Sequence, residues 1–218
     1  NRGFDPGRIA FELRMELSNV KGGIMTSDEI HRRNLEDILK TVRNAQRVYR
    51  NQGVEAVLRQ PELMPFLIEY LYSCDQKHSI KSAWVLELVC LFEIRLLLPY
   101  LTEFTSRLNT LEKESAIRPV SKVCSLISLH CDKHPCDSEV QDSSWKNNII
   151  EASFEWLTGP HKIAAQVFAM ESLFILGQES DWILDELYSI LDKHYPNKSS
   201  GYQSRARKIM DKISKVKR

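Results

Sequence analysis

The chain has 218 residues, of which 43% are hydrophobic and 27% are charged, and its formal net charge is +1. This length and composition predict a single soluble domain with one well-buried core. A net charge this close to zero gives no overall reason to expect nucleic acid or a membrane surface as a partner. The charge is nevertheless uneven, because residues 193–218 hold nine Lys and Arg and a single acid, Asp211.

The five cysteines are odd in number and irregularly spaced. This usage fits a reducing compartment better than a disulfide framework, so we expect a cytoplasmic protein. No apolar stretch approaches the roughly 20 residues that a membrane-spanning helix needs. The N-terminus also lacks the basic and then apolar layout of a signal peptide. No membrane association is therefore expected.

The first predicted element follows Met25. Thr26 and Glu29 have the Thr-x-x-Glu spacing of a helix capping box. Because the chain begins with Asn1, we expect the native protein to start near Met25. Residues 1–24 are then a disordered or non-native extension, and residues 25–218 form the domain.

Helical periodicity continues through the rest of the chain. Leu35, Ile38, Leu39 and Val42, for example, recur at the three- and four-residue steps of an amphipathic helix. No segment shows the alternation and turn signals of a strand and hairpin. The glycines after residue 25 fall where this periodicity breaks, which predicts helix ends at Gly53, Gly159, Gly177 and Gly201. The predicted helices are 28–51, 54–60, 62–73, 78–93, 95–109, 115–131, 143–157, 161–176, 180–193 and 202–216.

Two segments of the chain resemble each other. Residues 63–67, Leu-Met-Pro-Phe-Leu, precede residues 78–83, His-Ser-Ile-Lys-Ser-Ala. Residues 97–101, Leu-Leu-Pro-Tyr-Leu, precede residues 115–120, Ser-Ala-Ile-Arg-Pro-Val. The prolines are 34 residues apart and the Ile-Lys and Ile-Arg pairs are 37 apart. This is the period of a two-helix repeat.

Two less similar units follow, so that a basic residue lies near the start of four second helices, at Lys81, Arg118, Lys162 and Arg205. Their spacings are 37, 44 and 43 residues. Over residues 55–216 this pattern resembles HEAT repeats, and the longer period fits that family. The resemblance implies an all-α fold, a right-handed α-α superhelix (solenoid) of about four helix pairs, with an extra N-terminal helix. The second helices then line its concave face.

Longer strings resemble a narrower group. Residues 84–87, 115–119 and 161–165 are similar to small all-helical bacterial proteins, common in Bacteroidetes, that carry the label adenylosuccinate lyase. The label implies lyase chemistry. That superfamily uses a mobile loop of the form Ser-Ser-x-Met-Pro-x-Lys-x-Asn, which the pairs at Ser143-Ser144 and Ser199-Ser200 do not match. No lyase residue is therefore carried over.

Trp84 and Glu87 are the candidates for catalysis. Three residues apart on a predicted helix, they place an aromatic plane and a carboxylate near one groove. The pair resembles the tryptophans and acid of HEAT-like DNA glycosylases of the alkylation-repair type. In that family the acid supports the positive charge that develops on the sugar. The apolar run from Ala83 to Val89 favours another interpretation, in which Trp84 packs between repeats and Glu87 forms an ion pair.

A metal site has four candidate ligands within seven residues, namely His130, Cys131, His134 and Cys136. Imidazole and thiolate are ligands that zinc prefers. The spacing lacks the paired Cys-x-x-Cys of a zinc finger, however, and Pro135 should end the helix before Cys136. We therefore interpret the cluster as a polar helix end. No Gly-rich phosphate loop is present either, and no cofactor is expected.

The predicted function is non-catalytic binding. A protein partner or a small ligand is expected on the concave face, with DNA as the alternative partner and a monomer or weak oligomer as the assembly. The basic C-terminal helix is expected to close the stack with a polar outer face. The ridge expected to make the contacts consists of Lys81, Trp84, Glu87, Arg118, Lys122, Lys162 and Gln166.

Overall fold

The computed structural model describes residues 25–135 and 144–216. Within these residues every regular element is a helix and no strand occurs, which confirms the predicted all-α class. Its α-helices are α2 (Ser27–Thr41), α3 (Arg47–Arg59), α4 (Met64–Leu71), α5 (Gln76–Phe92), α6 (Leu101–Thr105), α7 (Glu114–Lys133), α8 (Ser144–Thr158), α9 (Ile163–Leu176), α10 (Asp181–His194) and α11 (Ser200–Val216). Short 3-10 helices cover Pro61–Leu63, Ile94–Leu96, Leu98–Tyr100, Leu108–Thr110, Gly177–Glu179 and Tyr195–Asn197.

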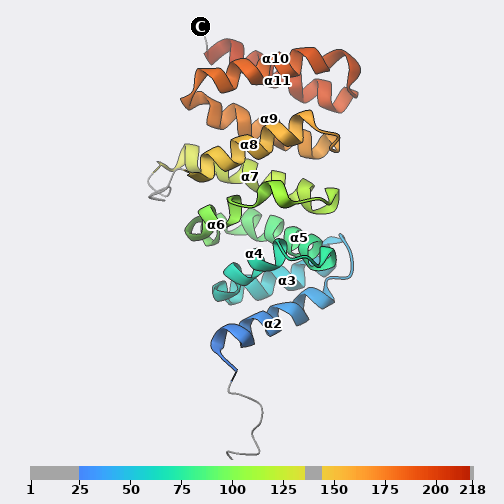
Figure 1. Cartoon of the computed structure of the whole chain (residues 1–218), viewed down its shortest axis with the longest axis vertical. Helices are drawn as coiled ribbons and strands as arrows, with labels where there is room; N and C mark the ends of the chain where they lie inside the picture. The colour runs from blue at the N-terminus through green and yellow to red at the C-terminus, as the bar shows by residue number, and fades with distance from the viewer. Residues whose placement is uncertain (1–24, 136–143, 217–218) are drawn as a thin grey trace, which may run out of the picture.

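The helices follow one another along the long axis of the molecule, from α2 at one end to α10 and α11 at the other (Figure 1). The odd-numbered helices, α3 to α11, pack against one another in chain order. The even-numbered helices α4, α8 and α10 each pack on the odd-numbered helix that follows them, α2 packs on α3, α4 and α5, and α6 packs on α8. One continuous cluster of buried side chains extends from Leu35 on α2 to Ile213 on α11.

The capping box predicted at the start of α2 is confirmed. The backbone N–H of Glu29 donates to Oγ1 of Thr26 at 3.3 Å, and the backbone N–H of Thr26 donates to Oε2 of Glu29 at 2.8 Å. These two bonds satisfy amide groups that the first turn of a helix leaves without partners. The helix therefore begins where the local sequence predicts.

The predicted helix 28–51 is divided in two. Helix α2 ends at Thr41, and α3 begins at Arg47 and continues through Gly53, which was expected to be a helix end. A Cβ atom on Gly53 would lie 2.7 Å from Cγ2 of Val85 on α5. This glycine is therefore explained by the close approach of α3 to α5.

The predicted helix 95–109 is replaced by a series of short helical turns around the five-residue α6. Pro99 lies at the start of one of these turns and offers no N–H for a helical hydrogen bond. The hydroxyls of Thr105 and Thr110 donate to the carbonyls of Leu101 and Arg107 at 2.8 and 2.7 Å. Such side-chain bonds compete with the regular helical ladder, so the segment stays irregular.

Candidate binding surface

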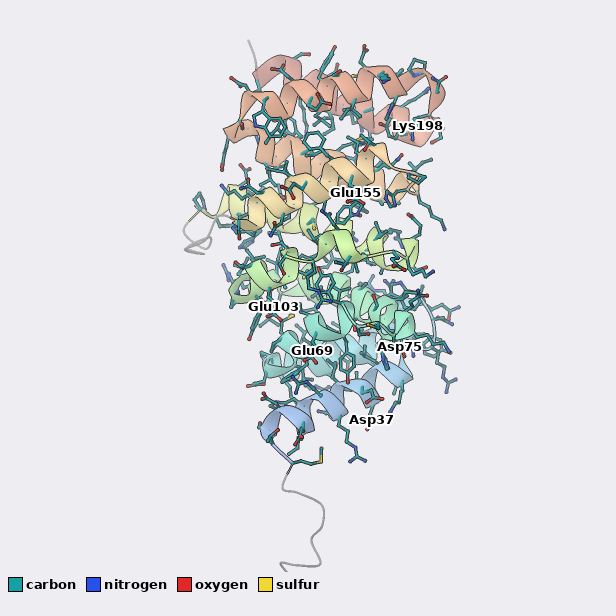
Figure 2. The ribbon with its side chains drawn as sticks, in the orientation of Figure 1. Asp37, Glu69, Asp75, Glu103, Glu155 and Lys198 are labelled. Atoms are coloured by element: carbon teal, nitrogen blue, oxygen red, sulfur yellow. The ribbon has the colours of Figure 1, made fainter. Side chains whose placement is uncertain are left out.

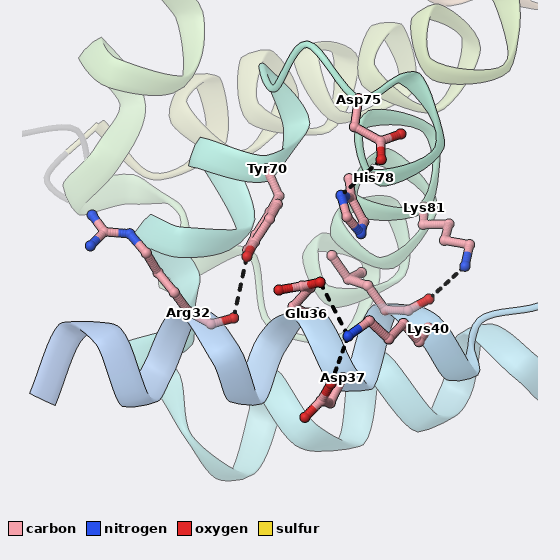
Figure 3. Close-up of polar contacts among 9 residues, drawn as sticks. Arg32, Glu36, Asp37, Lys40, Tyr70, Asp75, His78 and Lys81 are labelled. Carbon is pink, nitrogen blue, oxygen red and sulfur yellow. Dashed lines mark hydrogen bonds and ion pairs between the residues drawn. The ribbon is translucent and has the colours of Figure 1, made fainter. Parts of the chain in front are cut away.

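Lys81 and Trp84 connect α5 to its neighbours. Lys81 donates from Nζ to the carbonyl of Leu39 at 2.9 Å, in the last turn of α2 (Figure 3). This carbonyl also accepts the backbone N–H of Val42 at 3.2 Å, and the cation complements the negative end of the helix dipole. Trp84 is half-buried, and its indole N–H donates to the carbonyl of Ser115 at 3.1 Å, at the start of α7. Both side chains therefore have structural contacts.

The carboxylate of Glu87 is enclosed between two cations from two other helices. Its Oε1 lies 3.0 Å from Nζ of Lys122 on α7, and its Oε2 lies 3.3 Å from Nη1 of Arg50 on α3. The side chain of Glu87 is only 5% exposed. A buried carboxylate needs such partners, because an unpaired charge is costly to remove from water. Lys122 also lies 6.0 Å from the ring centroid of Phe168 on α9.

A second acid continues the same pattern toward the C-terminus. Glu171 on α9 accepts a hydrogen bond from Oγ of Ser125 on α7 at 3.1 Å. Its other carboxylate oxygen lies 2.8 Å from Nη1 of Arg205 on α11. Polar contacts thus join each odd-numbered helix to the next. We call these residues the ion-pair row: Arg50, Glu87, Lys122, Ser125, Glu171 and Arg205.

The sequence reasoning missed Arg50, Ser125 and Glu171 in this row. The repeat period indicates the partners of Glu87, because Arg50 precedes Glu87 by 37 residues and Lys122 follows it by 35. Residues one period apart lie on neighbouring odd-numbered helices. Oppositely charged residues at that separation therefore indicate ion pairs between neighbouring odd-numbered helices.

The other predicted ridge residues differ in exposure. Gln166 is buried, and its amide donates to the carbonyls of Leu157 and Gly159 and accepts from Nζ of Lys198 at 3.2 Å. Arg118 and Lys162 are exposed. Of the seven ridge residues, these two therefore remain the most available to a partner.

Glu114 connects the start of α7 to the turn before α9. One oxygen lies 2.6 Å from Nδ1 of His161, and the other accepts from the backbone N–H of Lys162 at 3.0 Å. His78 also lies near a carboxylate, that of Asp75 three residues earlier, with 3.4 Å between Nδ1 and Oδ2 (Figure 3). Both histidines are therefore engaged near helix starts.

The candidate metal ligands lie at the C-terminal end of α7. The rings of His130 and His134 are 4.9 Å apart, and Cys131 is buried. Cys136 lies outside the described residues. Within 25–135 and 144–216, no three His, Cys, Asp or Glu side chains are grouped so that they could hold a metal ion.

Two other cysteines are enclosed in the core. Burial raises the pKa of the thiols of Cys90 on α5 and Cys124 on α7 far above their usual range. The thiolate is the nucleophilic form of cysteine. Neither side chain is therefore available for nucleophilic chemistry at neutral pH.

Charge is divided between the two sets of helices. The odd-numbered helices hold thirteen Lys and Arg and six Asp and Glu, whereas α2, α4, α6, α8 and α10 hold five and twelve. The first set is therefore at net +7 and the second at net −7. Figure 2 labels four of these acids, Asp37, Glu69, Glu103 and Glu155, on α2, α4, α6 and α8.

Comparison with protein-family models, with curated proteins and with solved structures gave no match for this chain. In the part of the chain that the structure describes, no helix has both the length and the apolar character needed to cross a membrane.

Proposed function

We propose that the chain is a non-catalytic binding protein that receives a protein partner across its odd-numbered helices. One observation carries this proposal: Glu87, the acid best placed for catalysis, is enclosed by Arg50 and Lys122. A carboxylate whose two oxygens both face cations is poorly placed to act on a substrate. Its contacts instead hold α3, α5 and α7 together, which leaves the exposed side chains around it for recognition.

The proposed architecture is a HEAT-like, right-handed stack of about four helix pairs. Four basic residues support it, because Lys81, Arg118, Lys162 and Arg205 belong to four consecutive odd-numbered helices or their caps. Lys81 and Arg205 are each the sixth residue of their helix, and Arg118 is the fifth. These three positions agree within one residue, as expected of a repeat, whereas Lys162 is the N-cap of α9.

The distribution of charge favours a protein over DNA. The positive charge of the odd-numbered helices is not continuous, because α9 has no Lys or Arg and carries Glu171. Helix α11 alone supplies five of the thirteen bases. A surface with both signs of charge suits a protein partner, whereas phosphate recognition along a duplex needs a basic strip. DNA is the second candidate, and the net charge of these helices favours it.

Charge reversal tests the proposed surface. A partner would first be isolated on the wild-type chain and identified. Its affinity would then be measured for the Arg118→Glu/Lys162→Glu variant and for a control, the Arg33→Glu/Lys193→Glu variant. The control pair lies on even-numbered helices and is equally exposed. We expect the first variant to bind at least about tenfold more weakly and the control to bind normally. Equal binding by both variants would place the partner elsewhere.

Duplex DNA and adenylosuccinate test the alternatives. Binding of intact duplex and of duplex with an abasic-site analogue would be followed across a salt series, and lyase turnover by absorbance. We expect no salt-dependent preference for the lesion and no turnover. Lesion-selective binding that weakens steeply with salt would replace the protein-binding proposal with the repair-related one.

A further inference from the structure

Trp182 is the most exposed tryptophan of the described residues. It lies in the first turn of α10 and is 60% exposed, whereas Trp145 and Trp156 are each 1% exposed. Its ring stacks on Phe154 of α8, with 6.0 Å between centroids and 23° between planes. The stacking fixes the orientation of the indole, yet most of its surface faces water. A large aromatic side chain held in this way is typical of an interaction site.

The indole borders a groove of about 320 Å³ between α8 and α10. Ile150, Leu176 and Ile183 supply apolar walls. Two acids, Glu151 and Glu179, also line it. The groove therefore places apolar and acidic side chains next to one exposed indole.

Acidic side chains lie on the two helices that form this groove, and Glu151 is one of its lining residues. Glu151 and Glu155 on α8, and Asp181 and Glu186 on α10, are exposed, and none is paired with another described residue. The cation of the groove, Lys146, is already engaged by Glu179, with Nζ 2.7 and 2.6 Å from the two carboxylate oxygens. The free charge around Trp182 is therefore negative.

We propose that this surface, the Trp182 groove, binds a basic extended segment of a partner protein. An Arg or Lys side chain of that segment lies on the indole of Trp182, where the negative face of the ring attracts a cation. Further cations pair with the four unpaired carboxylates. The surface lies mainly on α8 and α10, and none of the ion-pair row lines it, so this proposal is independent of the proposed function.

Fluorescein-labelled octa-arginine is the probe, with octa-glutamate as the charge-reversed peptide, and binding is read by anisotropy. We expect octa-arginine to bind and octa-glutamate not to bind. Trp182→Ala should weaken binding about 3- to 10-fold, and Trp182→Phe should weaken it less, because the smaller ring still attracts a cation. Glu151→Gln/Glu155→Gln should weaken binding and reduce its salt dependence, since two charges are lost.

The matched control is Asp28→Asn/Glu62→Gln, which removes two exposed acids in and next to α2, at the other end of the molecule from α10 (Figure 1). It should bind octa-arginine within about twofold of the wild type. The proposal is overturned if Trp182→Ala binds like the wild type, or if the control weakens binding as much as the groove variant. It is also overturned if analytical ultracentrifugation shows a dimer that Trp182→Ala dissociates, since a second copy would then be the occupant.

Discussion

Lys122 on α7 and Glu87 on α5 form an ion pair with 3.0 Å between nitrogen and oxygen, in a place where the carboxylate is almost out of contact with water. Arg50 holds the second oxygen from the opposite side at 3.3 Å. One acid thereby compensates two cations on two different helices. The pair matters for stability mainly through what happens when one member is removed, because the remaining charges keep their desolvation cost.

Replacing Glu87 by Gln should therefore lower the free energy of unfolding by about 1–3 kcal/mol. The value lies below that of a fully buried pair, since the side chains of Arg50 and Lys122 are 16% and 26% exposed. Urea unfolding followed by circular dichroism measures it as a shift of the midpoint at constant slope.

Glu55→Gln is the matched control for this change. Glu55 pairs with Arg59 on α3 at 3.4 Å, and both side chains are largely exposed. An exposed pair of this kind contributes about 0.5 kcal/mol or less. Equal losses in the two variants would contradict the enclosed environment described for Glu87.

Two glycines should respond oppositely to replacement by alanine. At Gly53 the new Cβ would meet Val85, a buried β-branched side chain with little rotamer freedom. Overpacking there should outweigh the better helix propensity of alanine and destabilise the fold by about 1–2 kcal/mol. At Gly201, in the first turn of α11, nothing lies within 4 Å of the added atom. Gly201→Ala should therefore stabilise by about 0.5 kcal/mol.

Chemical unfolding of Gly53→Ala and Gly201→Ala alongside the wild type compares these two effects. A Gly53→Ala variant as stable as the wild type would mean that α3 and α5 separate at little cost. The opposite signs are informative because the sequence alone gives both positions the same interpretation.

Local sequence patterns predicted the helical class and several helix ends. The capping box at Thr26 and the helix end near Gly159 depend on neighbouring residues only, so the local sequence predicts both. The predicted helix end at Gly53 is wrong. A glycine in a helical pattern can mark either a helix end or the close approach of another helix. Only the position of Val85 distinguishes them.

The candidate surface was predicted less well for a related reason. Periodicity placed Glu87 on the correct element, but its partners come from helices 37 and 35 residues away. Nothing in the sequence distinguishes the exposed Trp182 from the buried Trp145 and Trp156, since its exposure depends on how α8 and α10 pack. Exposure and pairing are tertiary properties, and a single chain read along its length shows them only through the repeat period.

Tyr72 and Tyr202 should respond differently to the loss of their hydroxyls. The hydroxyl of Tyr72 donates to the carbonyl of Phe104 and joins the end of α4 to α6. Tyr72→Phe should therefore destabilise by about 1 kcal/mol. The hydroxyl of Tyr202 is buried with no hydrogen-bond partner among the described residues. Tyr202→Phe should be neutral or stabilise by up to about 1 kcal/mol, because an unsatisfied polar atom leaves the core.

Thermal and urea unfolding at pH 7 rank these two variants against the wild type. The expected order of stability is Tyr202→Phe at or above the wild type, and Tyr72→Phe below it. A clear loss in Tyr202→Phe would show that its hydroxyl has a partner in solution, such as an ordered water.

Tyr202 should also make the fold sensitive to alkaline pH. Burial raises the pKa of its phenol to about 12, whereas an unfolded chain has a tyrosine pKa of about 10. Between these values the unfolded chain releases the proton and the native protein retains it, so the native state binds more protons. Stability contributed by this group is complete below about pH 10 and is lost as the pH rises toward about 12.

The free energy of unfolding, measured in urea at steps from pH 8 to pH 12, should fall more steeply in the wild type than in Tyr202→Phe. Other groups that titrate in this range, including Tyr72, are present in both chains, so the difference between the two curves isolates Tyr202. Tyr188→Phe removes an exposed phenol from α10 and serves as the control. Parallel curves for wild type and Tyr202→Phe would mean that the Tyr202 phenol ionises as readily in the folded protein as in the unfolded chain. That result would contradict the burial of Tyr202 beneath Lys198, whose ammonium lies 5.3 Å from the ring centroid.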